Sequence, residues 1–330
     1  MKTHIAINGF GRIGRNLFRL LWEHPTIEVV AINDIAEATT MAHLLKYDSI
    51  HGIMNADVSA SEDYLIINEK KIKYSREKQL EQLIWTNIDI VIEATGKFKT
   101  LIEVEKHILA GAKKVILSAP PEDDHIKTIV LGVNDHILDG TETVISNASC
   151  TTNNAAPMIK IIDELCGIEQ AYITTVHSYT TDQSLHDQPH KDLRRARGAA
   201  QSIVPTTTGA AKALTKIFPH LEGKLGGSGI RVPVPNGSLT DITCYVKKAV
   251  SIETINKTFQ HASNHELKGI LDYTEVPIVS VDIIGNQHSC LFDAQLTSVI
   301  DKMVKVVGWY DNEIGYSSRL INLISKISNK

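Results

Sequence analysis

The sequence has few cysteines, no long apolar run and no strong excess of charge. Its four cysteines form no C-x-x-C pair, and no cysteine–histidine spacing in the chain matches a zinc site. No window reaches the roughly 18 apolar residues that a membrane span requires. No cationic segment leads into an apolar one at the amino end, as it does in a secretory signal. We therefore expect no metal ion, no membrane association and a cytoplasmic location in which a free thiol persists.

The charge balance argues against a polyanionic partner. The chain has 34 lysines and arginines against 38 aspartates and glutamates, a formal net charge of -4. This balance provides no general attraction for nucleic acid or for an anionic membrane. The densest basic stretch, residues 191–197, is too short and isolated for a nucleic-acid groove. A local anion site or a subunit contact is the better interpretation of that stretch.

The first half of the chain alternates strand and helix patterns. Residues 4–8 form a short apolar run that ends in glycines, and apolar residues then recur at helical spacing at positions 13, 17, 20 and 21. Further short runs rich in β-branched residues predict buried strands at 29–34, 90–92, 115–117 and 128–131. Such strands fit a parallel sheet covered on both faces. We therefore predict an α/β fold with a Rossmann-type, doubly wound parallel sheet.

The second half of the chain has a different rhythm. Apolar residues at 158, 159, 162, 165 and 166 line one helical face, and Gly167 supplies a stop. Strand-like patterns follow at 172–176 and at 278–283, and residues 313–330 are helical again. At 330 residues the chain exceeds the usual size of one hydrophobic core. We expect a domain of residues 1–149, completed by helix 313–330, and a second domain of residues 150–312.

A glycine-rich turn follows the first predicted strand. Gly9, Gly11 and Gly14 form a G-x-G-x-x-G pattern between a strand and a helix, the context in which it indicates dinucleotide binding. The glycines allow a tight turn and let a pyrophosphate approach backbone N–H groups. Asp34 ends the next strand, where a carboxylate can bind both hydroxyls of the adenosine ribose. Because the same carboxylate repels the 2′-phosphate of NADP, the pattern favours NAD.

Cys150 differs in setting from the other cysteines. It lies between a strand end and a helix start, whereas Cys166 belongs to an apolar helical face. A helix N-terminus favours a thiolate over a thiol. His177, at the end of a strand-like run, can supply the base that a cysteine nucleophile requires. Cys150 and His177 are therefore the predicted nucleophile and base, with an unreactive buried thiol as the alternative.

Several segments resemble the glyceraldehyde-3-phosphate dehydrogenase family. The resemblance runs in order from Ile7 to Arg319 and is most specific around the cysteine. It rests on residues 8–15, 146–153, 177–180, 190–197, 205–213, 231–233 and 309–313. It implies an α+β catalytic domain with a largely antiparallel sheet, in addition to the Rossmann domain that binds NAD.

The resemblance also implies a reaction. D-glyceraldehyde 3-phosphate would be oxidised with NAD and inorganic phosphate to 1,3-bisphosphoglycerate. Cys150 would attack the aldehyde to give a thiohemiacetal, and His177 would act as the general base during hydride loss. The Cys150 backbone N–H and protonated His177 would stabilise the oxyanion. Inorganic phosphate would then cleave the resulting thioester.

Binding roles follow from the same resemblance. The cofactor would be held by Gly9, Gly11, Arg12, Ile13, Gly14, Asp34, Arg76, Ser118, Asn312 and Tyr316. One anion site would use Thr180, Asp182 and Arg231, and the other Ser149, Thr151, Thr208 and Gly209 with Arg195. Arginine forks and clustered hydroxyls suit phosphate oxygens, whereas Asp182 would orient donors. The family also implies a homotetramer, in which residues 183–205 reach a neighbour's cofactor.

The sequence departs from the family at Asn154, where a second cysteine usually follows the nucleophile. The nearest alternative function is erythrose-4-phosphate dehydrogenase, which tends to diverge at residues 178–180 and 205–209, both intact here. A semialdehyde or acyl-phosphate reductase would favour NADP, and Asp34 argues against that cofactor. A non-catalytic role, such as RNA binding, fits poorly with the acidic balance and the full set of catalytic residues.

Overall fold

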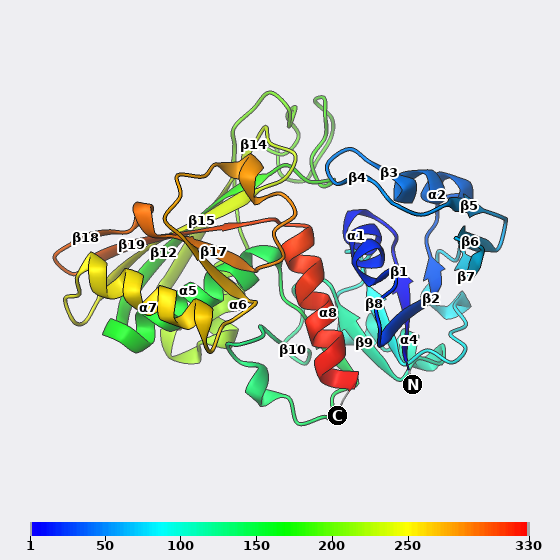
Figure 1. Ribbon diagram of the computed structural model, residues 1–330, viewed down its shortest axis with the longest axis horizontal. Helices are drawn as coiled ribbons and strands as arrows, with labels where there is room; N and C mark the ends of the chain where they lie inside the picture. Colours follow the sequence, from blue (N-terminus) through cyan, green and yellow to red (C-terminus); the bar gives the residue numbers. More distant parts are fainter. Residues whose placement is uncertain (1, 329–330) are drawn as a thin grey trace. The chain divides into compact units, whose positions relative to one another are not determined.

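The computed structural model describes residues 2–328, coloured along the sequence in Figure 1. The chain divides into two compact units. The first unit comprises residues up to 129, residues 136–148 and residues from 317 onward, and the second comprises residues 130–135 and 149–316. Within the described residues, no helix combines the length and the apolar character needed to cross a bilayer.

The first unit is built on a mostly parallel sheet. Its strands are β1 (Thr3–Asn8), β2 (Ile27–Asn33), β5 (Val58–Ala60), β6 (Tyr64–Ile67), β7 (Lys70–Ser75), β8 (Ile90–Glu93), β9 (Lys114–Leu117), β10 (Lys127–Thr128) and β11 (Val144–Ser146). Their order is β10-β11-β9-β8-β1-β2-β7-β6-β5. All pairs from β10 to β7 are parallel, whereas β7, β6 and β5 pair antiparallel. This parallel core confirms the predicted Rossmann-type sheet.

Besides the C-terminal residues from 317 onward, the first unit contains short helices and a small hairpin. They are α1 (Arg12–Leu21), α2 (Ala38–Lys46), α3 (Leu101–Val104), α4 (Lys106–Leu109) and the pair β3 (Tyr47–Asp48) and β4 (Gly52–Ile53). α1 starts directly after the glycine turn, as its helical spacing predicts. Its apolar residues Leu17, Phe18 and Leu21 are buried.

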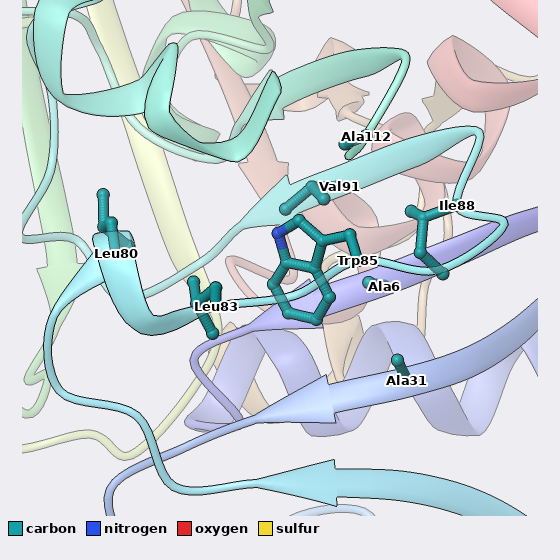
Figure 2. Packing of buried hydrophobic residues seen from close by; sticks show 8 residues of the cluster. All are labelled: Ala6, Ala31, Leu80, Leu83, Trp85, Ile88, Val91 and Ala112. Atoms are coloured by element: carbon teal, nitrogen blue, oxygen red, sulfur yellow. The ribbon is translucent and has the colours of Figure 1, made fainter. Parts of the chain in front are cut away.

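A buried cluster packs beside β1, β2 and β8. Figure 2 shows the Trp85 ring among Ala6, Leu83 and Val91. The alanines of β1 and β2 leave room for the large indole, because their side chains extend no further than Cβ. Trp85 is 5% exposed, so the ring is held by the core.

The second unit carries a largely antiparallel sheet. Its strands are β12 (Ile168–Ser178), β13 (Val204–Thr206), β14 (Leu225–Val232), β15 (Ser238–Val246), β16 (Leu271–Thr274), β17 (Cys290–Asp293), β18 (Ser298–Ile300) and β19 (Met303–Tyr310). The order is β13-β14-β12-β15-β19-β17-β16, with β18 paired to β19. Only β12–β14 and β16–β17 are parallel among the described pairs. The main helices are α5 (Cys150–Cys166), α6 (Ala210–Ile217) and α7 (Ile252–Asn264). This sheet confirms the predicted α+β class.

One predicted strand is wrong, and another is shorter than predicted. Residues 278–283 contain the 3-10 helix η4 (Ser280–Ile283), in which Val279 and Val281 are exposed and Ile283 is buried. The Val279 N–H donates to the Asp282 carboxylate, which closes this turn instead of a ladder. The predicted strand 128–131 stops at Thr128 in β10, because the Val130 N–H donates to Asn134 Oδ1 in a turn. The predicted helix 313–330 is observed as α8 (Ile314–Ser328), and its residues 329–330 lie outside the described residues.

Candidate active site

The candidate nucleophile follows a strand-to-helix turn. β11 ends at Ser146, and Ala148 adopts a left-handed backbone conformation with φ of 56°. Ser149 caps α5, since its Oγ accepts a hydrogen bond from the Thr152 N–H at 3.1 Å. Cys150 is therefore the first residue of α5, where backbone N–H groups carry partial positive charge.

Cys150 contacts His177. The distance from Cys150 Sγ to His177 Nε2 is 3.5 Å. His177 lies near the end of β12 and is 5% exposed, whereas Cys150 is partly exposed. The fold thus brings the two predicted catalytic residues together from an α-helix and a strand of the same unit.

Arg231 lies beside the histidine. β14 runs parallel to β12 with Arg231 in register with His177. Arg231 Nη1 is 2.6 Å from His177 Nδ1 and 3.0 Å from the Ser178 carbonyl oxygen, which is itself 2.7 Å from Nδ1. With a proton on Nδ1, the imidazole donates to that carbonyl and its Nε2 lone pair faces the sulfur. With Nδ1 accepting from Arg231, the proton lies on Nε2. General base catalysis requires the first tautomer.

Burial disfavours the charged forms of both Cys150 and His177. It raises the pKa of the Cys150 thiol, an effect that the positive charge of Arg231 opposes. Burial also lowers the pKa of His177 to about 3, and Arg231 acts in the same direction. Arg231 therefore favours a thiolate and disfavours an imidazolium. The histidine is held as a neutral imidazole, the form that can accept a proton.

Tyr310 is a neighbour of this pair that the sequence did not indicate. Its ring meets the His177 ring edge to face, with centroids 5.9 Å apart. Its hydroxyl lies 3.0 Å from those of Thr151 and Thr175. Because Thr175 donates to the Leu239 carbonyl, Tyr310 donates to Thr175, and Thr151 donates to Tyr310. Tyr310 belongs to segment 309–313 of the family resemblance, which was the available signal.

The predicted anion-binding arginines have different partners. Arg195 forms an ion pair with Asp182, and its Nε donates to Thr206 Oγ1 at 2.9 Å. Arg231 contacts no carboxylate within residues 2–328, and its only direct polar partners there are His177 and Ser178. Burial lowers the pKa of Arg231, and the nearby charge of Arg195 lowers it further. Two close guanidinium groups that repel one another favour binding of an anion.

The remaining predicted anion ligands lie mainly at helix starts. Gly209 immediately precedes α6, and the Thr208 hydroxyl oxygen accepts the Ala210 N–H at 3.2 Å. Ser149 has the matching position before α5. Thr180 follows β12, where its carbonyl accepts the Gln183 N–H at 2.9 Å. Helix starts supply N–H donors, which suit phosphate oxygens.

Asn312 is anchored by two serine hydroxyls. Its Oδ1 accepts hydrogen bonds from the hydroxyls of Ser178 and Ser238, each at 2.9 Å. The Ser238 oxygen in turn accepts the Ser178 N–H at 3.1 Å. With Oδ1 occupied, Asn312 Nδ2 is the group left to bind a ligand. The predicted cofactor residue Tyr316 lies nearby in sequence, within α8, and is 5% exposed. The role of Ser238 was missed, since an isolated serine carries no sequence signal.

In the first unit, the glycine turn borders a cleft. Gly9 has φ of 95°, and a Cβ there would lie 2.6 Å from the Thr95 backbone nitrogen. A Cβ on Gly14 would lie 2.3 Å from the Gly9 carbonyl oxygen. No described atom lies within 4 Å of a Cβ built on Gly11, so the start of α1 is open on that side. The cleft has a volume of about 220 Å³ and is lined by Asn8, Gly9, Gly11, Asn33, Asp34, Ile35, Glu77, Lys78, Leu80, Ala94, Thr95, Lys97 and Phe98.

The other predicted cofactor residues of the first unit begin α1 or directly follow the carboxyl ends of β2, β7 and β9. Asp34 Oδ2 accepts the Phe10 N–H at 2.7 Å, so the carboxylate is tied to the turn. The Arg12 guanidinium forms a forked ion pair with Asp48, which ties α1 to β3. Arg76 pairs with an exposed glutamate, Glu37. Ile13 follows Arg12 in α1. Ser118 directly follows β9, and its N–H donates to the carbonyl of Glu93 at the end of β8.

Comparison with known proteins agrees with this arrangement. Residues 3–101 match the family model described as glyceraldehyde 3-phosphate dehydrogenase, NAD binding domain, and residues 149–312 match that of the C-terminal domain. The chain is 53% identical to glyceraldehyde-3-phosphate dehydrogenase of Geobacillus stearothermophilus, over 100% of this chain and 99% of the relative. It is 52% identical to the Mycobacterium avium protein of that name, over 99% of both chains. The chain therefore belongs to the glyceraldehyde-3-phosphate dehydrogenase family.

Proposed function

We propose that this chain oxidises D-glyceraldehyde 3-phosphate with NAD and inorganic phosphate to 1,3-bisphosphoglycerate. The observation that carries the proposal is the 3.5 Å contact between Cys150 Sγ and His177 Nε2 at the start of α5. Family membership and the names of the full-length relatives favour this triose activity over the erythrose-4-phosphate alternative.

The first unit fits NAD. Gly9 and Gly14 leave backbone room that a side chain would fill, and Gly11 leaves the start of α1 open. We assign the pyrophosphate to the N–H groups of this turn, including those of Arg12 and Ile13, and the adenosine ribose to Asp34. Arg76 and Ser118 are assigned to the same cofactor, and Asn312 Nδ2 to its carboxamide with Tyr316. NAD supplies the acceptor for the hydride that leaves the substrate carbon.

Cys150 and His177 carry out the addition step. The sulfur forms a bond to the aldehyde carbon, and the carbonyl π electrons move to oxygen. The thiol proton passes to His177 Nε2, whose unprotonated form the nearby Arg231 favours. The Cys150 N–H and the protonated His177 stabilise the developing oxyanion, and His177 then passes its proton to this oxygen, which gives the thiohemiacetal and leaves the imidazole neutral again.

His177 then serves the oxidation and the release of product. It takes the hydroxyl proton of the thiohemiacetal as the carbon loses hydride, which leaves a thioester on Cys150. An oxygen of inorganic phosphate attacks the thioester carbon. The carbon–sulfur bond breaks, the sulfur leaves with its electron pair, and the acyl phosphate is released.

Two phosphates must be held close to this sulfur. We assign the substrate phosphate to Thr180 and Arg231, with Asp182 orienting donors. The attacking phosphate is assigned to Ser149, Thr151, Thr208, Gly209 and Arg195. Thr151 contributes its backbone N–H, since its hydroxyl is hydrogen-bonded to Tyr310.

We also propose a homotetramer in the cytoplasm. In residues 183–205, Leu185, Leu193 and Ile203 are 67%, 80% and 70% exposed in the single chain. A single exposed leucine is ordinary, whereas several large apolar side chains exposed in one stretch fit a surface that another chain covers.

The function is tested by NADH formation from purified protein. We expect a rate with D-glyceraldehyde 3-phosphate that requires phosphate, and kcat/KM for this aldehyde well above that for erythrose 4-phosphate. Phosphate-independent oxidation, or a preference for the four-carbon sugar, would contradict the assignment. Cys150→Ser should bind NAD but form no NADH.

A further inference from the structure

A chain of buried polar side chains lies beneath the nucleotide cleft of the first unit, and the reaction described above does not use it. Glu93 and His107 are both 0% exposed, Asn8 is 1% exposed and Asn33 is 3% exposed. Asn8, Glu93 and Asn33 end the adjacent strands β1, β8 and β2. We call Trp85, His107, Glu93, Asn8 and Asn33 the polar ladder.

Every hydrogen bond of the polar ladder has a fixed direction. The Trp85 indole is a donor only, and its Nε1 lies 3.1 Å from His107 Nδ1. The neutral His107 ring therefore carries its proton on Nε2, which donates to Glu93 Oε2 at 3.0 Å. Asn8 Nδ2 donates to the same oxygen at 2.6 Å, and Asn8 Oδ1 accepts from Asn33 Nδ2 at 2.8 Å. Neither asparagine amide can be reversed without placing two donors or two acceptors face to face.

Glu93 also anchors the segment that follows β8. Its Oε1 accepts the Thr95 N–H at 2.9 Å and the Thr95 hydroxyl. The carboxylate thus has four donors, while no lysine or arginine contacts it within residues 2–328. A buried carboxylate is costly unless such donors satisfy it, so the position selects for an acceptor of this shape and charge.

Glu93 bonds to Asn8 and to Thr95, and the glycine turn lies against the backbone of both residues. Thr95 presents its nitrogen 2.6 Å from the place where a Cβ of Gly9 would lie. Asn8 directly precedes Gly9, and its carbonyl accepts the Ala94 N–H at 2.7 Å. Asn8, Gly9 and Thr95 all line the cleft. A displacement of Glu93 would therefore move both walls of the cofactor site.

We propose that Glu93, oriented by His107 and Trp85, is a positioning residue for NAD, an inference that rests on the proposed function. The polar ladder presets the glycine turn in its binding shape before the dinucleotide arrives. Its contribution falls on cofactor affinity and leaves the chemistry of Cys150 unaffected.

The test compares Glu93→Gln with Glu142→Gln in the full chain, by calorimetric titration with NAD and by steady-state kinetics. Glu142 is a matched control in the first unit, because its largely buried carboxylate accepts from Asp139 N–H, Gly140 N–H and Lys127 away from the cleft. In the Glu93 variant the new amide N–H group faces ladder donors in either orientation. We expect the Kd for NAD to rise about tenfold or more, with kcat at saturating NAD and the KM for the aldehyde within about twofold. The Glu142 variant should lose thermal stability with the Kd for NAD unchanged.

A milder pair keeps the inference testable if Glu93→Gln does not fold. Trp85→Phe removes the indole donor and keeps an aromatic ring, whereas Ile88→Val trims the same apolar cluster without touching the polar ladder. The Kd for NAD should rise only in the tryptophan variant. Equal Kd values in each variant and its control would overturn the inference. Failure of the wild-type chain to bind NAD would instead overturn the proposed function.

Discussion

The positive charge of Arg231 determines in which direction the pH dependence of Cys150 labelling should shift when that charge is removed. The guanidinium lowers the thiol pKa, so Arg231→Gln should raise it. Since the thiolate is the reactive form, the pH of half-maximal iodoacetamide labelling should move upward in this variant. The measurement is the labelling rate against pH, read on the intact chain by mass spectrometry.

Arg195→Gln is the matched control for this shift. Arg195 pairs with Asp182 and Thr206 and does not contact Cys150 or His177, so its removal should move the labelling midpoint less than removal of Arg231 does. Equal shifts in both variants would contradict the role of Arg231. One thiol per chain should react, because Cys166, Cys244 and Cys290 are buried.

Asn154, the departure from the family pattern, has become a structural residue. Its Nδ2 donates to the carbonyls of Ser289 and Trp309, both at 3.2 Å, and the side chain is fully buried. Asn154→Cys should therefore lower the free energy of unfolding by about 1–3 kcal/mol, because two buried carbonyls lose their donor. Chemical denaturation measures this loss, with the exposed Asn264→Ala as a control expected to change little. Unchanged stability of Asn154→Cys would show that these carbonyls find other donors.

For single residues, the sequence indicates which side chains are reactive better than it indicates which residues they contact. Cys150 and His177 stand out because each ends a recognisable pattern. Tyr310 and Ser238 do not, because their partners come from strands whose register is absent from any local pattern. The same limit applies to Arg12, whose side chain pairs with Asp48 across 36 positions of sequence.

Among the elements, the turn before α5 stores conformational strain. Ala148 is buried with φ of 56°, a region that costs a residue with a Cβ about 1 kcal/mol or more. Ala148→Gly should therefore raise the free energy of unfolding by about 0.5–1 kcal/mol. Ala155→Gly, within α5, should lower it by about 1 kcal/mol or more, because glycine weakens a helix interior. Two thermal unfolding curves that move in the same direction would contradict this account.

The elements themselves divide into predictable and unpredictable groups. Buried runs such as β8 and β9 were predicted, because continuous β-branched sequences suit a parallel sheet. The alternation at 278–283 misled, because Val279 and Val281 are exposed and only Ile283 is buried, so these apolar residues do not share one buried face. The backbone of η4 closes a local turn in place of a strand ladder.

The compact units of the whole molecule are not continuous in sequence. Residues 130–135 belong to the second unit, and residues 136–148 return to the first. Composition does not change at these crossings, so no local pattern encodes them. The family resemblance was informative at this scale because it runs along the entire chain.

The proposed tetramer gives a prediction for the whole molecule. Sedimentation of the wild type should give the mass of four chains, and Leu193→Asp should shift it to smaller species, because a charge would enter a covered apolar surface. Leu109, 87% exposed and outside residues 183–205, is the control, and Leu109→Asp should leave the mass unchanged. A wild-type protein that sediments as a single chain would rule the assembly out.

The placement of the four thiols has a consequence for oxidative damage. Cys166 lies 16 residues further along α5, about 24 Å from Cys150. Cys290 packs near Met158, two helical turns along, and Cys244 pairs with Ala171, about 20 Å down β12 from His177. A sulfenic acid formed on Cys150 by peroxide therefore has no thiol in its own chain with which to close a disulfide. Such a sulfenic acid depends on a small external thiol for its recovery, and without one it proceeds to the irreversible sulfinic acid.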